Sequence, residues 1–364
     1  MENTIKNIIR QKGPLTFARF MELALYYPEL GYYTSHREII GREGDYYTSV
    51  HVNPVFGEML AEQLSQMADI LGEQEFNIVE FGAGRGFLAL DILNSLKKKY
   101  LRLFEGTSYY IIEVGPGLKQ KQRDLLEGEA GFQGKIKWLD SVKEVDKPFC
   151  GCVISNELVD AFPVHIVKQV GTELKEVYVD LKDNEFYEIL NEPSTPQLKD
   201  YFNRLNIKLR DGQRAEVNLA ALDWLKEVAE SLDRGFVLTI DYGYEAPLLY
   251  HPVRQDGTIM CYYRHQAGDN PYVNVGRQDI TAHVNFTALK IWGEDASLIT
   301  TGFTNQMHFL FNLGIIRAAQ GDDKKALAVQ QLVSPEGMGG TFKVLVQHKG
   351  IKDPQLKGFI DCLS

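Results

Sequence analysis

The sequence predicts an α/β fold built on a mostly parallel sheet. From residue 76 onward, short apolar runs alternate with segments of helical periodicity, as in consecutive βαβ units. The runs are continuously apolar, which is typical of strands buried on both faces. Strands are predicted at 77–81, 109–113, 135–139, 151–155 and 235–240, with helices at 87–100 and 116–126 between them and a last strand at 342–346.

The alternation of strands and helices covers only part of the chain. Residues 1–75 predict an N-terminal helical region, with one helix over 17–25, another from near Pro54 and a Gly- and Tyr-rich loop or lid between them. Residues 164–215 predict an inserted antiparallel subdomain. The remaining residues, 76–163 and 216–364, are expected to form the main α/β domain, in which 243–285 shows little periodicity.

Composition excludes several classes of protein. The 364 residues carry 39 Lys and Arg against 49 Asp and Glu, and this net charge of -10 argues against a nucleic-acid binder held by bulk electrostatics. The four cysteines are too few for a disulfide framework, and Cys150 and Cys152 lie in a predicted strand, so neither a disulfide nor a metal site is expected. No apolar run predicts a transmembrane helix, and residues 1–6 resemble neither a signal peptide nor an organelle presequence. We expect a cytoplasmic protein.

A glycine-rich turn gives the sharpest chemical signal. Glu80 is followed by Gly82, Gly84 and Gly86, between a predicted strand and a predicted helix. Glycines let the backbone approach a ligand closely, and the helix start offers free N–H groups. The spacing differs from the G-x-G-x-x-G of dinucleotide sites, and an acid before the loop would repel a pyrophosphate. It suits a ligand with an ammonium or sulfonium group, and S-adenosylmethionine has both.

Acidic and polar residues follow the next strands. Glu113 ends the second predicted strand, where an acid can accept hydrogen bonds from ribose hydroxyls, and Asp140 and Ser141 follow the third, where an adenine would lie. Each residue taken alone is also consistent with a solvated strand end. In this order they predict one crevice at the carboxyl ends of the strands.

Residues 156–163 follow the fourth predicted strand and supply the candidate catalytic groups. Asn156 is expected beside the donor, and Glu157 and Asp160 are one helical turn apart, so both side chains can face one target. Helix capping by Asn156 with acids in the first turn is the alternative interpretation. His265 and His283 lie in loop-like sequence, and either could serve as a general base; His283 is the preferred candidate.

The chain resembles the MidA-like methyltransferases, which include the mitochondrial complex I assembly-factor arginine methyltransferase. G-D-x-x-T-S at 44–49 and N-E-x-x-D-A at 156–161 are the most specific motifs, and others support them over nearly the whole chain. These are residues 13–17, 20–22, 28–33, 56–58, 80–86, 241–243, 257–258, 264–265, 279–284, 338–339 and 342–345.

The resemblance implies a Rossmann-like class I methyltransferase fold with S-adenosyl-L-methionine as the donor. It implies in-line methyl transfer to an arginine of a partner protein, with a respiratory-complex subunit as one candidate. Two positions depart from the family pattern: Asn285 replaces an expected Asp, and Gly115-Pro116-Gly117 replaces a serine-containing turn. Two other functions stay open: methylation of a small molecule at O or N, and a donor-binding assembly factor with little catalysis. The oligomeric state is not predicted.

Overall fold

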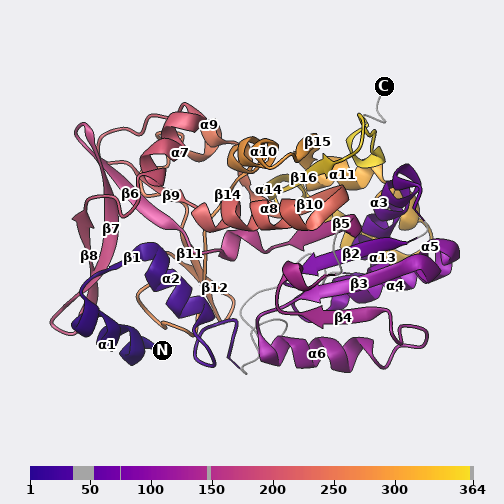
Figure 1. The fold of residues 1–364 in the computed structure, drawn as a ribbon, viewed down its shortest axis with the longest axis horizontal. Helices are drawn as coiled ribbons and strands as arrows, with labels where there is room; N and C mark the ends of the chain where they lie inside the picture. Colours follow the sequence, from indigo (N-terminus) through magenta and orange to yellow (C-terminus); the bar gives the residue numbers. More distant parts are fainter. Residues whose placement is uncertain (36–52, 74, 146–148, 361–364) are drawn as a thin grey trace. The chain divides into compact units, whose positions relative to one another are not determined.

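The computed structural model describes residues 1–35, 53–73, 75–145 and 149–360. The chain forms two compact units, each built from three stretches of sequence (Figure 1). Unit 1 comprises residues 1–46, 159–223 and 243–289, and unit 2 comprises residues 47–158, 224–242 and 290–364. The segment 1–75 that the sequence sets apart therefore contributes to both units. The motif at 44–49 and the greater part of the predicted lid lie outside the described residues.

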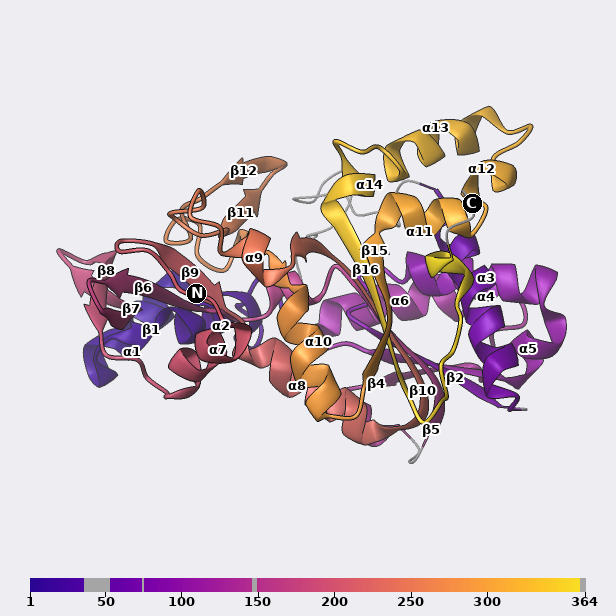
Figure 2. The same cartoon turned by 90° about the horizontal axis from the view of Figure 1, so that it is seen from above.

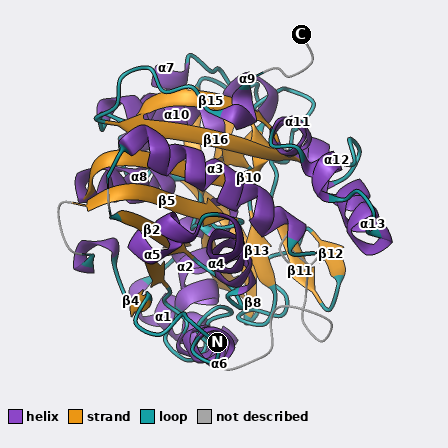
Figure 3. Ribbon diagram, turned by 90° about the vertical axis from the view of Figure 1, so that its right-hand side faces the viewer, coloured by secondary structure: helices purple, strands orange, loops and turns teal. Residues whose placement is uncertain are grey.

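Unit 2 contains a mixed sheet with the strand order β15-β16-β10-β5-β2-β3-β4 (Figure 3). β10, β5, β2, β3 and β4 pair in parallel, and β16 joins β10 and β15 antiparallel. The expectation of a mostly parallel sheet is confirmed. The strands are β2 (Phe76–Phe81), β3 (Thr107–Ile112), β4 (Ile136–Leu139), β5 (Phe149–Asn156), β10 (Leu232–Tyr244), β15 (Ile299–Asn305) and β16 (Phe342–Lys349).

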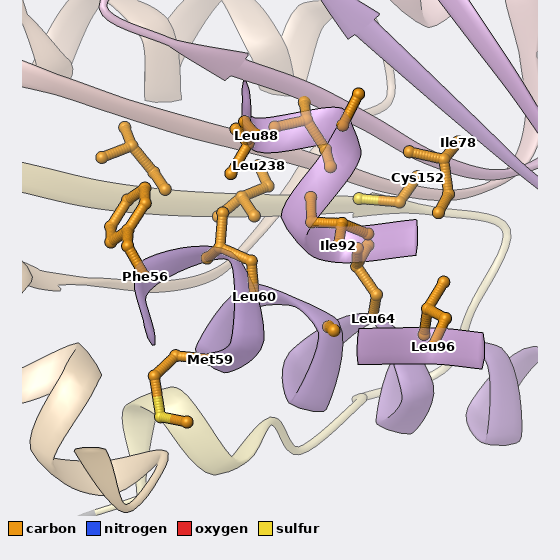
Figure 4. Close-up of a cluster of buried hydrophobic side chains, with 14 of the residues drawn as sticks. Phe56, Met59, Leu60, Leu64, Ile78, Leu88, Ile92, Leu96, Cys152 and Leu238 are labelled. Carbon is orange, nitrogen blue, oxygen red and sulfur yellow. The ribbon is translucent and has the colours of Figure 1, made fainter. Parts of the chain in front are cut away.

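Helices pack on this sheet through apolar side chains. Figure 4 shows Phe56, Leu60 and Leu64 of one helix and Leu88, Ile92 and Leu96 of another gathered in one cluster with Ile78, Cys152 and Leu238 of the strands. Burying each such side chain contributes about 1.5–3 kcal/mol. The helices before β5 are α3 (Val55–Leu71), α4 (Phe87–Lys99), α5 (Leu101–Gly106), α6 (Pro116–Leu126) and the 3-10 turn η2 (Val142–Glu144).

A group of short helices completes unit 2 between and beyond its last strands. Figure 2 shows α12 and α13 following α11 along one end of the sheet. Phe309 and Leu310 of α11 and Val329 and Leu332 of α13 join the same core as α3 and α4. These elements are α11 (Gln306–Asn312), α12 (Ile315–Ala318), α13 (Asp323–Leu332), α14 (Met338–Thr341) and η4 (Lys357–Phe359).

Unit 1 is built around an antiparallel sheet with the order β1-β7-β6-β9, to which β8 adds beside β7. This confirms the antiparallel hairpin that the sequence predicts after residue 164. Its strands are β1 (Leu15–Thr16), β6 (His165–Val170), β7 (Glu173–Lys182), β8 (Glu185–Asn191) and β9 (Arg214–Val217). Its helical elements are α1 (Glu2–Lys12), α2 (Phe17–Tyr26), η3 (Val159–Ala161), α7 (Gln197–Leu205) and α9 (Ala246–Leu249).

The region 243–285, which has little periodicity in sequence, contains short strands. β12 (Gln266–Gly268), β11 (Met260–Tyr263) and β13 (Asp279–Thr281) form a small antiparallel sheet, and β14 (Val284–Asn285) pairs with the end of β10. Strands of two to four residues are too short to show a period.

α8 (Leu219–Ser231) and α10 (Phe286–Asp295) each continue from one unit into the other. Among the residues described, no helix is both long and apolar enough to cross a membrane.

One acidic side chain lies in the contact between α3 and α4. A Cβ placed on Gly57 of α3 would lie 2.4 Å from the Cβ of Asp91, so the two helices approach as closely as only glycine allows. Burial, together with the nearby Glu58 carboxylate, raises the pKa of Asp91 to about 7. Glu58 itself forms an ion pair with Lys325 at 2.7 Å. Asp91 is therefore protonated in the folded protein at pH values where it is ionised in the unfolded chain.

Replacing Asp91 by Asn is expected to stabilise the protein in a pH-dependent manner. The unfolded chain loses the Asp91 proton near pH 4, whereas the folded protein keeps it until about pH 7. The folded state is thus destabilised progressively as the pH rises through this window. Asp91→Asn removes that penalty, so its melting temperature should exceed that of the wild type by a few degrees at pH 8 and match it near pH 4. Thermal melts across this range, with the exposed Asp69→Asn of α3 as the control, test this; equal gains in both variants would contradict it.

Candidate active site

The strand order of unit 2 determines where a ligand can bind. From β2 the chain proceeds outward through β3 to β4, and then returns to place β5 on the other side of β2. In parallel sheets a crevice opens at the carboxyl ends of the strands where the order reverses in this way. Here the reversal lies between β2 and β5, whose register pairs Phe81 with Ser155. The glycine turn follows β2, and Asn156 is the last residue of β5 with Glu157 directly after it, so both predicted motifs lie at this point.

The glycine turn has the backbone conformation that its sequence predicts. Gly82, Gly84 and Gly86 have φ values of 62°, 54° and 88°, in the left-handed region that residues with a Cβ avoid. A Cβ on Gly82 would lie 2.8 Å from a methyl carbon of Leu158. Gly86 is the N-cap of α4 and has no side chain with which to cap the helix. The first turn of α4, where a helix presents N–H groups without intrahelical partners, therefore lies directly beside the glycine turn.

A buried glutamine joins this turn to the next strand. The amide nitrogen of Gln122 donates to the Gly84 carbonyl at 2.8 Å and to Oε2 of Glu113 at 3.0 Å. Its amide oxygen accepts from the indole of Trp138 at 3.1 Å. Gln122 is fully buried, on the stripe of α6 that also buries Leu118 and Leu126. Gln122 is not among the residues predicted for the site, although a polar residue on an otherwise apolar helix face is a signal that the sequence contains.

Glu113 directly follows β3 and is 4% exposed. Its Oε1 accepts the Gly115 N–H at 2.8 Å, so the glycine-proline-glycine turn that departs from the family pattern supplies a backbone donor here. Burial raises the pKa of Glu113, against the hydrogen bonds from Gly115 and Gln122, which lower it. Each carboxylate oxygen can accept about two hydrogen bonds. Glu113 therefore keeps acceptor capacity for a ligand hydroxyl after its protein partners are satisfied.

Glu80 lies one strand away, near the end of β2, and is 2% exposed. Its Oε2 accepts a hydrogen bond of 2.7 Å from the Tyr109 hydroxyl of β3. The pKa of Glu80 is raised to about 7: burial raises it most, the hydrogen bond from Tyr109 opposes the rise, and the Glu113 carboxylate adds to it. A carboxyl group that is half ionised near neutral pH responds strongly to a nearby positive charge.

Asn156 and Glu157 lie at the end of β5. The Asn156 amide nitrogen donates to Oε1 of Glu157 at 3.2 Å, and its Oδ1 is buried with no hydrogen-bond partner in the described structure. Glu157 has a φ of 53°, which is unusual for a residue other than glycine. Its N–H donates to the Ile240 carbonyl of β10, and the next N–H, of Leu158, donates to Oδ2 of the buried Asp241. Neighbouring strand ends thus hold the backbone of Glu157 in a strained conformation.

Asp140 and Ser141 follow β4, as predicted, and both have protein partners. Asp140 is exposed and forms an ion pair with Lys119 of α6. The Ser141 hydroxyl accepts the Lys143 N–H at 3.2 Å and caps the short helix η2. Capping is thus one role of Ser141, and contact with an adenine stays a prediction for both residues.

Asp160 and His283 belong to unit 1, where two of its chain segments meet. Asp160 lies in η3 and is 5% exposed, and its carbonyl accepts the Ala282 N–H at 2.9 Å. The His283 N–H donates to the Thr258 hydroxyl at 3.1 Å, and its ring lies beside that of Tyr244. Asp160 and His283 therefore lie near each other in unit 1, whereas Glu157 lies in unit 2. His265 has a φ of 61° in the tight turn between β11 and β12.

Asn285 has a structural role that accounts for its departure from the expected Asp. Its amide nitrogen donates to the hydroxyls of Tyr201 at 2.9 Å and Tyr250 at 3.4 Å, while its Oδ1 accepts the Ala288 N–H at the start of α10. The Tyr250 hydroxyl donates in turn to the Glu216 carbonyl. A carboxylate could accept from Ala288 but could not donate. An amide therefore satisfies this buried arrangement without introducing a charge.

The site of unit 2 fits S-adenosyl-L-methionine on its own geometry. The glycine turn and the start of α4 leave backbone N–H groups for the methionyl carboxylate, and Glu80 places a buried carboxyl group near the same turn. Glu113 keeps acceptor capacity for ribose hydroxyls, and the unpartnered Oδ1 of Asn156 can accept a hydrogen bond. When bound, this molecule supplies an electrophilic methyl group on a sulfonium. Within the described ranges, no cluster of three His, Cys, Asp or Glu side chains could hold a metal ion.

Solved structures with the same fold are known. A COG1565 superfamily methyltransferase from Burkholderia thailandensis, crystallised with S-adenosyl-homocysteine, is 33% identical with a TM-score of 0.91. The similarity covers 99% of this chain and 94% of that one. A native structure of a Burkholderia thailandensis protein from this superfamily is 32% identical with a TM-score of 0.87, over 99% of this chain and 94% of that one.

Sequence comparisons extend the similarity to eukaryotes. The mitochondrial protein arginine methyltransferase NDUFAF7 homolog of Drosophila melanogaster is 26% identical over 94% of this chain and 83% of its own length. The human protein arginine methyltransferase NDUFAF7 is 28% identical over 94% of this chain and 82% of its own. The model of a family of S-adenosyl-L-methionine-dependent methyltransferases matches residues 59–304, and the MidA-like resemblance is confirmed. The chain therefore belongs to this family of methyltransferases, and S-adenosyl-L-methionine is its methyl donor.

Proposed function

We propose that this methyltransferase modifies an arginine side chain of a partner protein. The observation that carries the proposal is the Glu157 carboxylate, held at the strand-order reversal by a strained backbone and hydrogen-bonded to Asn156. A guanidinium is positive at neutral pH, with a pKa above about 12. A carboxylate can orient such a group, draw positive charge away from the attacking nitrogen and accept the proton that leaves it.

The names of the curated relatives support the same acceptor. Those quoted above are protein arginine methyltransferases of mitochondria, and this chain covers more than four-fifths of their length. A subunit of a respiratory complex is the partner that we propose to test first. We keep the cytoplasm as the proposed location. Asp160, three residues after Glu157 in the sequence, is proposed as a second carboxylate for the acceptor, and His283 as a general base.

Isotope labelling tests the acceptor directly. Purified enzyme and tritium-labelled S-adenosyl-L-methionine are added to an extract of cells that lack the gene, and the labelled proteins are hydrolysed to amino acids. Radioactivity in methylarginine is the expected result. Label in a small metabolite would favour a small-molecule methyltransferase instead. Absence of transfer, together with restored assembly of a protein complex by an inactive variant, would favour an assembly factor with little catalysis.

Replacing Glu157 by Gln should separate donor binding from transfer. Gln keeps the size of the side chain but cannot accept the proton of a guanidinium, so the transfer rate should fall by about 100-fold or more. The donor Kd, measured by calorimetric titration, should change by less than about threefold, since the groups proposed to bind the donor are untouched. Glu144→Gln, in the turn η2, is the matched control. Near-normal turnover in Glu157→Gln would remove Glu157 from the mechanism.

The buried carboxyl group of Glu80 should make donor binding depend on pH. Its pKa is about 7, and its ionised form attracts the ammonium group of the donor, so affinity should rise from pH 6 to pH 8 and then level off. Glu80→Gln removes the charge; affinity at pH 8 should fall about tenfold, and the rise with pH should be lost.

Tyr109→Phe provides a second variant at the same site. It removes the hydrogen bond that lowers the pKa of Glu80, so the pKa rises and the binding curve should shift to higher pH without losing its shape. Calorimetric titration at several pH values measures all three proteins. A wild-type affinity that is flat from pH 6 to pH 8 would contradict the proposed contact between Glu80 and the donor.

A further inference from the structure

Three hydrogen bonds from separate segments of unit 1 hold the turn η3. The amide nitrogen of Asn218 donates to the Val159 carbonyl at 3.0 Å, and the Ala282 N–H donates to the Asp160 carbonyl at 2.9 Å. The Tyr26 hydroxyl donates to the Ala161 carbonyl at 3.0 Å. All three consecutive carbonyls of the turn therefore accept from donors that are distant in sequence. We call these three hydrogen bonds the carbonyl clamp.

Each donor of the carbonyl clamp is itself fixed by other contacts. Asn218 precedes α8, and its Oδ1 accepts the Ala221 N–H at 2.9 Å, so the same side chain caps this helix. The ring of Tyr26 stacks on that of Tyr33, with 5.5 Å between the ring centres. The Tyr33 hydroxyl donates to both carboxylate oxygens of Asp279, at 2.8 and 2.9 Å.

The third donor, the Ala282 N–H, is fixed through a buried carboxylate. The next N–H, of His283, donates to the Thr258 hydroxyl. That hydroxyl donates to Oε2 of Glu216 at 3.0 Å, and the Thr258 N–H donates to Oε1 at 3.0 Å. Gly257 has a φ of 82°, and a Cβ there would lie 2.0 Å from Oε1, so only glycine fits beside this carboxylate. The clamp thus links the backbone of Asp160 to that of Ala282, the residue before His283. Asp160 and His283 are the two residues of unit 1 that are proposed to act on the acceptor.

We propose that the carbonyl clamp positions Asp160 for methyl transfer, with Asn218 and Tyr26 as positioning residues. Hydrogen bonds from two side chains and one backbone N–H, all distant in sequence, reach every carbonyl of this three-residue turn, which exceeds what a simple chain reversal requires. Phe162 N–H already closes the turn by donating to the Val159 carbonyl at 3.2 Å. Misplacement of a catalytic group by about 1 Å can cost about 100-fold in rate, so a turn that carries such a group gains from this restraint. The inference rests on the proposed acceptor role of Asp160.

Asn218 allows the clamp to be removed while the helix cap is kept. Asn218→Asp retains an oxygen that can cap α8, because Asp and Asn are comparable N-caps, but it places a second acceptor opposite the Val159 carbonyl. Asn218→Ser also keeps a capping oxygen and is too short to reach that carbonyl, so it removes the donor without adding charge. Asn305→Asp is the matched control, since Asn305 caps α11 through Oδ1 and the His308 N–H at 2.9 Å.

Amide hydrogen exchange tests the clamp without any acceptor. In both Asn218 variants, the amides of Phe162 and Ala282 should exchange about fivefold faster or more, the factor expected for losing one ordinary hydrogen bond. Within the clamp, Ala282 and Asn218 bond to different carbonyls of η3. Faster exchange of the Ala282 amide would therefore show that loss of the Asn218 hydrogen bond loosens the whole turn. Asn305→Asp should leave both amides unchanged. Unchanged exchange in the Asn218 variants, or equal changes in the control, would overturn the proposal.

The transfer reaction then distinguishes positioning from simple stability. With labelled donor and the extract described above, total label transferred at saturating donor should fall about tenfold or more in both Asn218 variants. Their donor Kd and melting temperature should stay close to those of Asn305→Asp. Exchange that rises while transfer is unchanged would overturn the role in positioning. Absence of label with the wild type would count against the proposed function. The amide exchange result would then still show whether the clamp holds the turn.

Tyr26→Phe is the second route if the Asn218 variants do not fold. It removes only the hydroxyl that reaches the Ala161 carbonyl and keeps the ring that stacks on Tyr33. The same increase in amide exchange at Ala282 and the same loss of transfer are expected. Tyr27→Phe, which removes the hydroxyl of the next residue, should change neither. A Tyr26→Phe protein with wild-type exchange and transfer would overturn the proposal.

Discussion

The parallel pairing of β2 with β3 on one side and β5 on the other is the constraint on which the donor site depends. Parallel strands bring their carboxyl ends to one edge of the sheet, so residues far apart in sequence meet there. The strand order reverses at β2, and the residues that follow β2 and β5 are those at which such a sheet binds its ligand. Without this arrangement, the glycine turn would be only a tight connection between a strand and a helix.

Burial of polar groups is the second condition that shapes this edge. Glu80, Glu113 and Gln122 lie in the interior, where a polar group without partners would cost about 1–3 kcal/mol. Gln122 meets this requirement by joining the carbonyl of Gly84 to the carboxylate of Glu113, so one amide orients two parts of the site. Because both carboxyl groups are desolvated, their pKa values lie above the usual range. A positively charged ligand counters this desolvation better than a neutral one, which is consistent with a sulfonium donor.

Much of this architecture could be predicted from the sequence because its signals are local. The strands of unit 2 are continuous apolar runs, and the positions of Gly82, Gly84 and Gly86 after β2 already indicate the backbone conformation that the turn adopts. The family resemblance, which rests on motifs along the chain, predicts S-adenosyl-L-methionine as the donor and a protein arginine as the acceptor. The residues that follow each strand then fall at the carboxyl edge of the sheet by topology alone.

What the sequence could not predict depends on contacts between distant segments. The joining role of Gln122 requires Gly84, Glu113 and Trp138 to meet, and no local pattern encodes that meeting. The division into units was also hidden, because β1 pairs with β7 across more than 150 residues of sequence. Short strands such as β12 and β13 are held by their partners and have no periodicity of their own.

The same reasoning explains why the two proposed carboxylates need different means of support. Glu157 is held by hydrogen bonds from its own and the following N–H to groups of β10, which force a left-handed backbone that costs about 1 kcal/mol or more. Asp160 lies in a single turn of 3-10 helix, which is intrinsically weak because its hydrogen-bond geometry is poor. A strained residue at a strand end is fixed by the sheet, whereas a residue in an isolated turn must be fixed by its neighbours. That difference gives a physical reason for the carbonyl clamp at 159–161.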